Sequence, residues 1–247
     1  MNRSSGGAAD RPDGVASFPA GPRWGDREAV SVLVAAELVL VLGGSLVIGL
    51  GGWDPKNVPI AAQFVAMLPF WSFSLLAARW VTTKYGDGPV TDLRIRFRTI
   101  DVVIGIVAGV GTQLVVIPLI YWPILRWLDS DTRDLEKVAR QLGDSAHGPV
   151  GAVLLVVLTC VGAPFVEEVL YRGLLLGSME QRSRPMAVVV SAAVFAALHF
   201  EPLQFAGLFV FGLILGAIVV RTRRLGPSII AHAAFNATTV FSLLRHH

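Results

Sequence analysis

Three ionisable side chains stand close together in a part of the sequence that is otherwise apolar. Glu167, Glu168 and Arg172 all lie in the stretch TCVGAPFVEEVLYRGLLLG. An ionised side chain at the centre of a membrane helix costs about 2.5–3.5 kcal/mol on insertion scales, so we expect all three to face protein or water rather than lipid. Glu168 and Arg172 are four residues apart and can pair on one helix face. Glu167 is rotated by about 100° from Glu168 and is free to meet another helix.

Two later apolar segments carry the polar groups that Glu167 could meet. The stretch FAALHF places His199 after Phe195, and the stretch AHAAFNA places His232 and Asn236 on one face of a helix. A carboxylate and a neutral imidazole can hold and deprotonate a water molecule. An amide N–H and a second imidazole can stabilise the oxyanion of a tetrahedral intermediate. The candidate catalytic residues for a hydrolytic reaction are therefore Glu167, His199, His232 and Asn236.

Zinc is an alternative use of the same side chains. Glu167, His199 and His232 could bind Zn²⁺, whose bound water would then be the nucleophile. The sequence contains no HExxH pair that would set two histidines on one helix face, so we expect a site without a cofactor. Taken singly, a histidine or asparagine in an apolar helix is often structural, and a buried Glu168–Arg172 pair can simply fix packing. The combination of these groups is what indicates catalysis.

The composition indicates a membrane protein. Of the 247 residues, 53% are hydrophobic and 16% are charged, and the mean hydropathy is +0.62. A soluble domain carries about 25% charged residues, so this chain is typical of a protein with several membrane spans. The net charge is +3, but the arginines lie between apolar segments rather than in one basic patch, so nucleic acid is excluded as a partner. Lysine is scarce beside arginine and alanine, which favours a bacterial source.

Seven apolar segments follow an N-terminal tail rich in Gly, Pro, Ser and Asp. The tail, residues 1–27, is predicted to be disordered and cytosolic, and it does not read as a signal peptide. The segments are Ala29–Leu50, Val58–Val81, Ile100–Leu125, Val150–Leu176, Met186–His199, Pro202–Val220 and Pro227–Leu244. All but the fifth are long enough to cross a hydrocarbon core of ~30 Å. We therefore predict an all-α transmembrane bundle of about seven helices over residues 28–247. Glu37 and Gln113 stand alone in their segments and receive no role.

The loops between these segments predict the orientation in the bilayer. If seven helices alternate, all basic clusters fall on the same side as the tail. The clusters contain Arg94, Arg96 and Arg98, then Arg182 and Arg184, then Arg221, Arg223 and Arg224. The positive-inside rule places this side in the cytoplasm. We expect a multi-pass protein of the plasma membrane with a cytoplasmic N-terminus and an external C-terminus.

The polar stretches also match a set of ordered motifs. EEVLYR fits EExxxR, FAALH fits FxxxH, and HAAFN fits HxxxN, while FVFGLILGAIVVRT is similar to a further Gly-containing motif. In this order and spacing, residues 150–244 resemble the CPBP family of CAAX proteases and bacteriocin-processing enzymes, also called the Abi family. That family includes the type II CAAX prenyl endopeptidase.

The resemblance implies an intramembrane endopeptidase with its site in the C-terminal half of the bundle. It implies that Glu167 activates water with the help of His199, and that His232 and Asn236 bind the oxyanion. The Glu168–Arg172 pair would support the site. The substrate would be a membrane-associated or CAAX-like protein, or a lipid-anchored peptide, reached within the bilayer.

Two other classes of function use the same residue types. A non-catalytic membrane partner, such as an immunity-type protein, could share the fold and would tolerate the loss of Glu167. A proton-coupled transporter could use Glu167 and the histidines as a relay. Many transporters contain repeats in their two halves, and no internal repeat is visible in this sequence, which disfavours that function.

Overall fold

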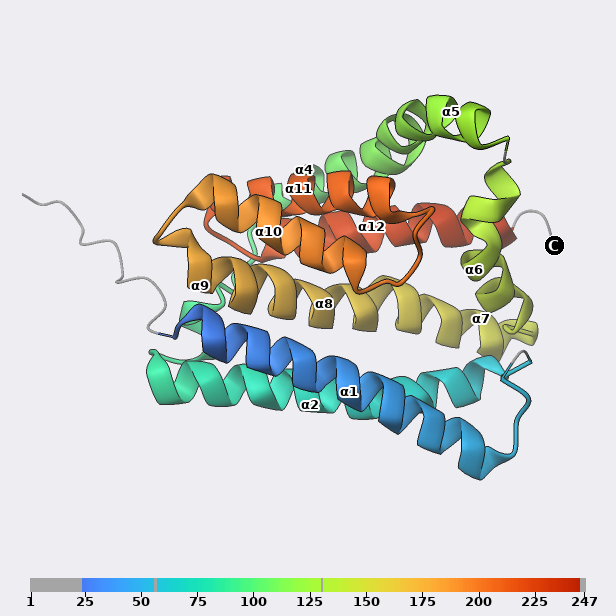
Figure 1. Ribbon diagram of the computed structural model, residues 1–247, viewed down its shortest axis with the longest axis horizontal. Coiled ribbons are helices and arrows are strands. Elements are labelled where there is room, and N and C mark those ends of the chain that lie inside the picture. Colours follow the sequence, from blue (N-terminus) through green and yellow to red (C-terminus); the bar gives the residue numbers. More distant parts are fainter. Residues whose placement is uncertain (1–23, 56, 130, 245–247) are drawn as a thin grey trace, which may run out of the picture.

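The computed structural model describes residues 24–244 except 56 and 130, and in that part of the chain all regular structure is helical. Helices α1 (Asp26–Gly51) and α2 (Ile60–Tyr85) form an antiparallel pair along one side of the bundle (Figure 1). The expected tail falls largely outside the described residues. Helix α1 already begins at Asp26, two residues before the predicted start of the helical domain.

The third and fourth apolar segments each form one long helical run that changes its hydrogen-bond pattern. The third run joins α4 (Thr99–Gly111), the π-helical segment η1 (Thr112–Val116) and α5 (Ile117–Leu128). The fourth joins α7 (Gly148–Val156), the π-helical segment η2 (Val157–Gly162), α8 (Ala163–Glu168), the π-helical segment η3 (Val169–Leu175) and α9 (Leu176–Glu180). We call this fourth run the motif helix. The last three segments form α10 (Arg184–Ala197), α11 (Phe205–Thr222) and α12 (Gly226–Leu244).

Five of the described helical runs are long and apolar enough to cross a membrane. They are Asp26–Gly51, Ile60–Tyr85, Thr99–Leu128, Gly148–Glu180 and Phe205–Thr222. Helix α10 is apolar but shorter, and α12 is not among the five. The all-α membrane bundle is therefore confirmed, whereas a total of about seven spans stays a prediction.

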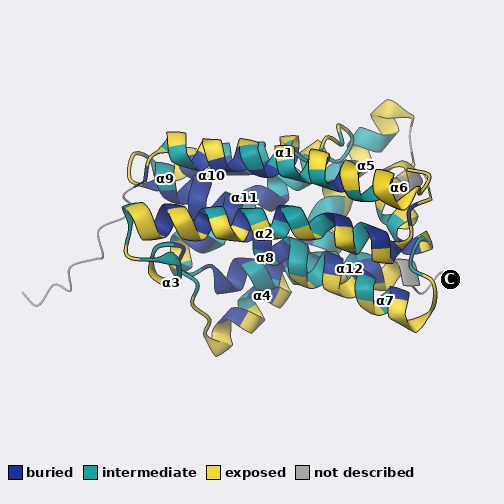
Figure 2. Ribbon diagram, turned by 90° about the horizontal axis from the view of Figure 1, so that it is seen from below, coloured by how far each residue is buried: buried dark blue, intermediate teal, exposed yellow. Residues whose placement is uncertain are grey.

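The surface of the bundle is apolar in a way that suits lipid. Figure 2 shows exposed positions recurring along α1 and α2, and the contacts of these two helices are mainly with each other and with the motif helix. Exposed apolar side chains include Leu50 at 81% and Leu119 at 70% of their accessible area. Patches of this kind on a protein in water would favour association, but hydrocarbon solvates them well.

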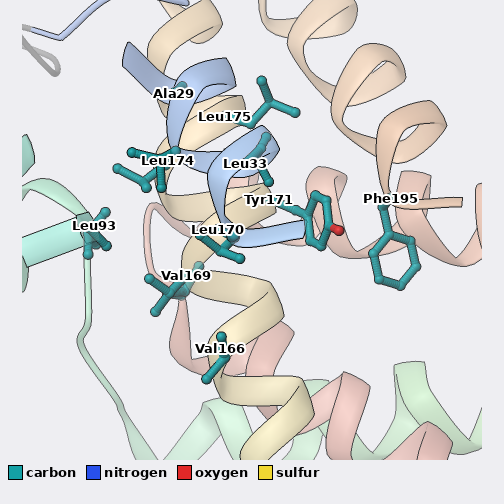
Figure 3. Close-up of a cluster of buried hydrophobic side chains, with 14 of the residues drawn as sticks. Ala29, Leu33, Leu93, Val166, Val169, Leu170, Tyr171, Leu174, Leu175 and Phe195 are labelled. Atoms are coloured by element: carbon teal, nitrogen blue, oxygen red, sulfur yellow. The ribbon is translucent and has the colours of Figure 1, made fainter. Parts of the chain in front are cut away.

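The core of the bundle surrounds the motif helix. Leu170 and Leu174 of this helix are fully buried, and Leu174 and Leu175 lie beside Ala29 and Leu33 of α1 (Figure 3). The indole of Trp24 also donates a hydrogen bond to the Leu174 carbonyl at 3.2 Å. Lipid is as apolar as leucine, so close packing and such polar contacts hold the helices together rather than the exclusion of water.

Two connections between the long helices contain short helices of their own. The mixed-charge stretch after α5 forms α6 (Thr132–Asp144), and the Leu135 carbonyl of this helix accepts a hydrogen bond from Gln204 at 3.1 Å. Between the charged residues of this stretch, Leu135, Val138 and Leu142 recur at a helical spacing. The segment before α4 contains α3 (Pro89–Asp92), followed by a turn and by residues without regular secondary structure.

Candidate active site

Glu168 and Arg172 form the ion pair that their spacing predicts. Arg172 Nη1 lies 2.9 Å from Glu168 Oε1, and neither side chain has any exposed area. The same guanidinium donates to the Gly212 carbonyl of α11 at 3.4 Å and lies 4.4 Å from the ring centroid of Phe195 on α10. Arg172 therefore fastens the motif helix to two neighbouring helices, because a guanidinium can bond through several N–H groups and stack through its face.

His232 of α12 reaches both glutamates of the motif helix. Its Nδ1 lies 3.2 Å from Glu168 Oε1, and its Nε2 lies 3.8 Å from Glu167 Oε2. Because an ionised carboxylate only accepts hydrogen bonds, the bond to Glu168 requires the proton of His232 to sit on Nδ1. The distance of 3.8 Å exceeds a hydrogen bond, so a second proton on Nε2 would interact with Glu167 mainly through charge.

Glu167 differs from Glu168 in its exposure and in its partners. The Glu167 side chain keeps 19% of its area exposed, whereas the Glu168 side chain is fully buried. Glu167 Oε2 has no hydrogen-bond partner in the described part of the molecule. Arg172 and His232 both approach Glu168, so Glu167 is the carboxylate of the two that is better placed to act on a reactant.

His199 enters the site from the turn that follows α10. Its Nδ1 lies 2.6 Å from the Phe195 carbonyl, which can only accept, so Nδ1 carries the proton and Nε2 keeps a lone pair in the neutral ring. The Phe195 ring contacts both imidazoles, with centroid distances of 4.7 Å to His199 and 5.7 Å to His232. Phe195 is a fully buried core residue that also positions both histidines. Within the described residues His199 has no direct hydrogen bond to Glu167, so their cooperation through one water stays a prediction.

Asn236 is fastened to the motif helix on the N-terminal side of the glutamates. Its Nδ2 donates to the Thr159 carbonyl at 2.7 Å, and Thr159 belongs to the π-helical segment η2. A π-helical turn shifts the backbone bonds from the i+4 to the i+5 amide, which changes which carbonyls are free to accept a side chain. The carboxamide has a second N–H group, so this structural bond leaves one donor for an oxyanion.

Glu37 of α1 joins this region although its position in the sequence indicated no role. The Tyr171 hydroxyl lies 3.4 Å from Glu37 Oε1, and Glu37 is within electrostatic range of Glu167. Tyr171 follows Glu167 by one turn, and its ring packs against Phe195 with a centroid distance of 5.3 Å (Figure 3). The general rule that an ionisable residue inside a membrane needs a partner could have marked Glu37 as a candidate.

The side chains of the zinc alternative do not form a metal site as they are placed. Zinc needs ligand atoms roughly 3–4 Å apart around one point. Glu167 and His232 meet this requirement at 3.8 Å, and the bond from His199 Nδ1 to the Phe195 carbonyl leaves only Nε2 as a possible ligand atom of that ring. Among the described residues, no group of three His, Cys, Asp or Glu side chains is close enough to hold a metal ion. No step of the chemistry below therefore passes through a metal.

A family model matches the part of the chain that contains this site. The family is described as type II CAAX prenyl endopeptidase Rce1-like, and the match covers residues 149–238. The resemblance to the CAAX protease family is confirmed over this segment. The Rce1-like segment includes all six candidate residues, whereas α1, α2, α4 and α5 lie outside it. No curated protein and no solved structure matches the chain. Because the family is one of proteases, the match supports hydrolase chemistry in a multi-pass membrane protein.

Proposed function

We propose that the protein is an intramembrane endopeptidase that hydrolyses a peptide bond in a membrane-associated or CAAX-like substrate. The observation that carries this proposal is the position of His232 against both Glu167 and Glu168, within the Rce1-like segment. In this position, the oriented imidazole of His232 lies beside the partly exposed carboxylate of Glu167 inside a helical bundle. The expected substrates are a membrane protein or a lipid-anchored peptide, and the expected location is the plasma membrane with the N-terminus in the cytoplasm.

In the proposed reaction, Glu167 takes a proton from a water molecule while the water oxygen attacks the scissile carbonyl carbon. His199 offers the lone pair of Nε2 to the same water, because its Nδ1 proton is held by the Phe195 carbonyl. The carbonyl oxygen then carries a negative charge. When this tetrahedral intermediate collapses, the C–N bond breaks and Glu167 returns its proton to the leaving amine.

The oxyanion is stabilised in this proposal by groups on α12. Asn236 contributes the N–H that is not bonded to Thr159, and His232 contributes an N–H from a protonated Nε2. Glu168 orients that ring because it accepts the hydrogen bond from Nδ1. Arg172 in turn balances the charge of Glu168, so the ion pair acts on the reaction through His232 rather than by touching the substrate.

The test is cleavage of a membrane-peptide library by the purified protein in liposomes, with fragments identified by mass spectrometry. Glu167→Gln is nearly isosteric and should lower the cleavage rate by about 100- to 10,000-fold, the usual contribution of a general base. Glu28→Gln is the matched control, because it changes the same residue type at the start of α1, far along the chain from the site. It should cleave at the wild-type rate.

Two results would count against this proposal. Cleavage by Glu167→Gln at the wild-type rate would exclude the glutamate mechanism. A folded wild-type protein that cleaves no member of the library would favour the non-catalytic membrane partner, which needs the fold but not the carboxylate.

A further inference from the structure

A second polar site lies where α4 and α12 begin and α11 ends. It is a cavity of about 480 Å³, and its lining residues are Arg96, Phe97, Arg98, Thr222, Arg223 and Arg224. None of these residues belongs to the candidate active site. We call it the arginine cavity. It borders the ends of helices rather than their middles, which places it at the level of the membrane surface.

The arginines around this cavity outnumber the carboxylates that pair with them. Asp101 is fully buried, and its carboxylate accepts hydrogen bonds from Arg224 Nη2 at 2.5 Å and from Arg224 Nε at 3.1 Å. Glu180 is shared by three arginines, namely Arg94, Arg184 and Arg223.

Two further arginines leave the cavity with excess positive charge. In the described part of the chain no carboxylate forms an ion pair with the side chain of Arg96 or Arg98. The four lining arginines, together with Arg94 and Arg184 that share Glu180 with Arg223, make six arginines against the two carboxylates of Asp101 and Glu180. Burial and the neighbouring Arg94 lower the pKa of the Arg223 guanidinium, although Glu180 acts in the opposite direction. An added anion would relieve this crowding of like charges.

The backbone around the arginine cavity is fixed rather than loose. Leu225 N donates to the Arg94 carbonyl at 2.9 Å, which joins the segment before α4 to the turn before α12. Arg94 and Arg223 have φ of 56° and 57°, a left-handed conformation that costs a non-glycine residue about 1–3 kcal/mol and persists only where its surroundings hold it. A Cβ on Gly226 would lie 2.6 Å from the Arg96 carbonyl, so this close approach requires glycine.

The surroundings of the cavity indicate a lipid rather than a free anion. A guanidinium matches the geometry of a phosphate with two parallel hydrogen bonds. Phe97 beside the arginines is 55% exposed, so an apolar ring borders the positive charges. Directly after Arg98, the residues Ile100, Val103 and Val107 expose 54%, 57% and 67% of their area along one face of α4. Acyl chains could lie on this face while the headgroup occupies the cavity.

We propose that the arginine cavity binds the phosphate of an anionic glycerophospholipid, with the acyl chains along the exposed face of α4. This inference does not depend on the proposed peptidase activity. It assigns the phosphate to Arg96 and Arg98, the two lining arginines that form no ion pair within the described residues, although Arg98 lies within electrostatic range of Asp101. Arg223 and Arg224 supply the fixed positive wall. Basic pockets between membrane helices are suited to anionic headgroups by the same physics.

The experiment is native mass spectrometry of the purified protein, titrated in detergent with phosphatidylglycerol or phosphatidylcholine. The wild type should retain phosphatidylglycerol selectively. Arg96→Gln with Arg98→Gln should weaken this binding by about 30-fold, from about fivefold for each arginine near an anionic group. Arg27→Gln with Arg79→Gln is the matched control, because it removes two exposed arginines near the first turn of α1 and the last turns of α2, outside the cavity. Thermal unfolding of each variant shows whether it is folded.

Four outcomes would overturn the proposal. The first is equal retention of phosphatidylglycerol by the wild type and the cavity variant, and the second is a loss in the control pair as large as that in the cavity variant. The third is retention of phosphatidylcholine by the wild type as strong as that of phosphatidylglycerol. The fourth is displacement of the lipid by inorganic phosphate at the lipid's own concentration. The second would show a general effect of surface charge. The last would show a site for free phosphate instead of a lipid.

Discussion

Replacement of Arg172 by alanine is expected to destabilise the protein strongly. Breaking a buried ion pair costs about 3–5 kcal/mol, because the remaining charge is left without its partner. Glu168 would be that charge, and its side chain has no exposed area. The variant also loses the guanidinium above Phe195, a cation–π contact worth about 0.5–2 kcal/mol. His232 Nδ1 would still donate to Glu168, which keeps the expected total near 4 kcal/mol rather than at the sum of the upper values.

The loss can be measured as a shift of the unfolding temperature in detergent, followed by tryptophan fluorescence. For a chain of this size, 1 kcal/mol corresponds to about 2–4 °C, so Arg172→Ala should lower the Tm by about 8–16 °C. Arg182→Ala is the matched control. It breaks the ion pair between Arg182 and Asp26. The Arg182 side chain is 69% exposed, and exposed ion pairs contribute at most about 1 kcal/mol.

A second variant separates the ion pair from general damage to packing. Glu168→Gln combined with Arg172→Ala removes both charges, so its loss should be smaller than the sum of the two single losses by about 0.5–3 kcal/mol. The reasoning would be refuted by an Arg172→Ala protein that loses no more Tm than the Arg182→Ala control. It would also be refuted by strict additivity in the double variant.

Three other predictions follow from the site and the loops. Asn236→Ala should lower the unfolding free energy by about 1–3 kcal/mol, because the Thr159 carbonyl loses its donor, and an unchanged Tm would show that this bond contributes nothing. Reporter fusions at Arg98 and Arg224 should read as cytoplasmic and a fusion after His247 as external, and the opposite result at either arginine would invalidate the alternation of seven helices. Chelators should leave cleavage by purified protein unchanged, whereas stoichiometric zinc whose removal abolishes activity and whose return restores it would replace the glutamate mechanism.

The sequence was sufficient for features that depend on neighbouring residues. The ion pair of Glu168 and Arg172 could be predicted because a spacing of four residues determines which side chains share a helix face. The contact of His232 with Glu168 joins residues 64 positions apart, and it depends on how two helices cross and rotate. Residue types showed that these groups complement each other, but they could not show that His232 lies against both glutamates.

Departures from regular helix geometry limited the prediction most. The bond from Asn236 to the Thr159 carbonyl depends on a π-helical segment, and the apolar pattern of the sequence does not reveal one. Glu37 was left without a role because its partner Tyr171 lies 134 positions away. Both cases involve long-range contacts of the motif helix, whose own apolar character was evident from the start.

The π-helical segments η2 and η3 bracket the two glutamates, and they make the motif helix sensitive to changes of length. Deletion of one residue within residues 157–162 would allow η2 to close to an α-helix and would turn the preceding turns by about 100° relative to Glu167. In an alignment, a relative without this segment would show a single-residue gap inside a membrane helix, where gaps are otherwise disfavoured. Such a gap would identify relatives in which the carbonyl equivalent to that of Thr159 is no longer presented to an asparagine on the last helix.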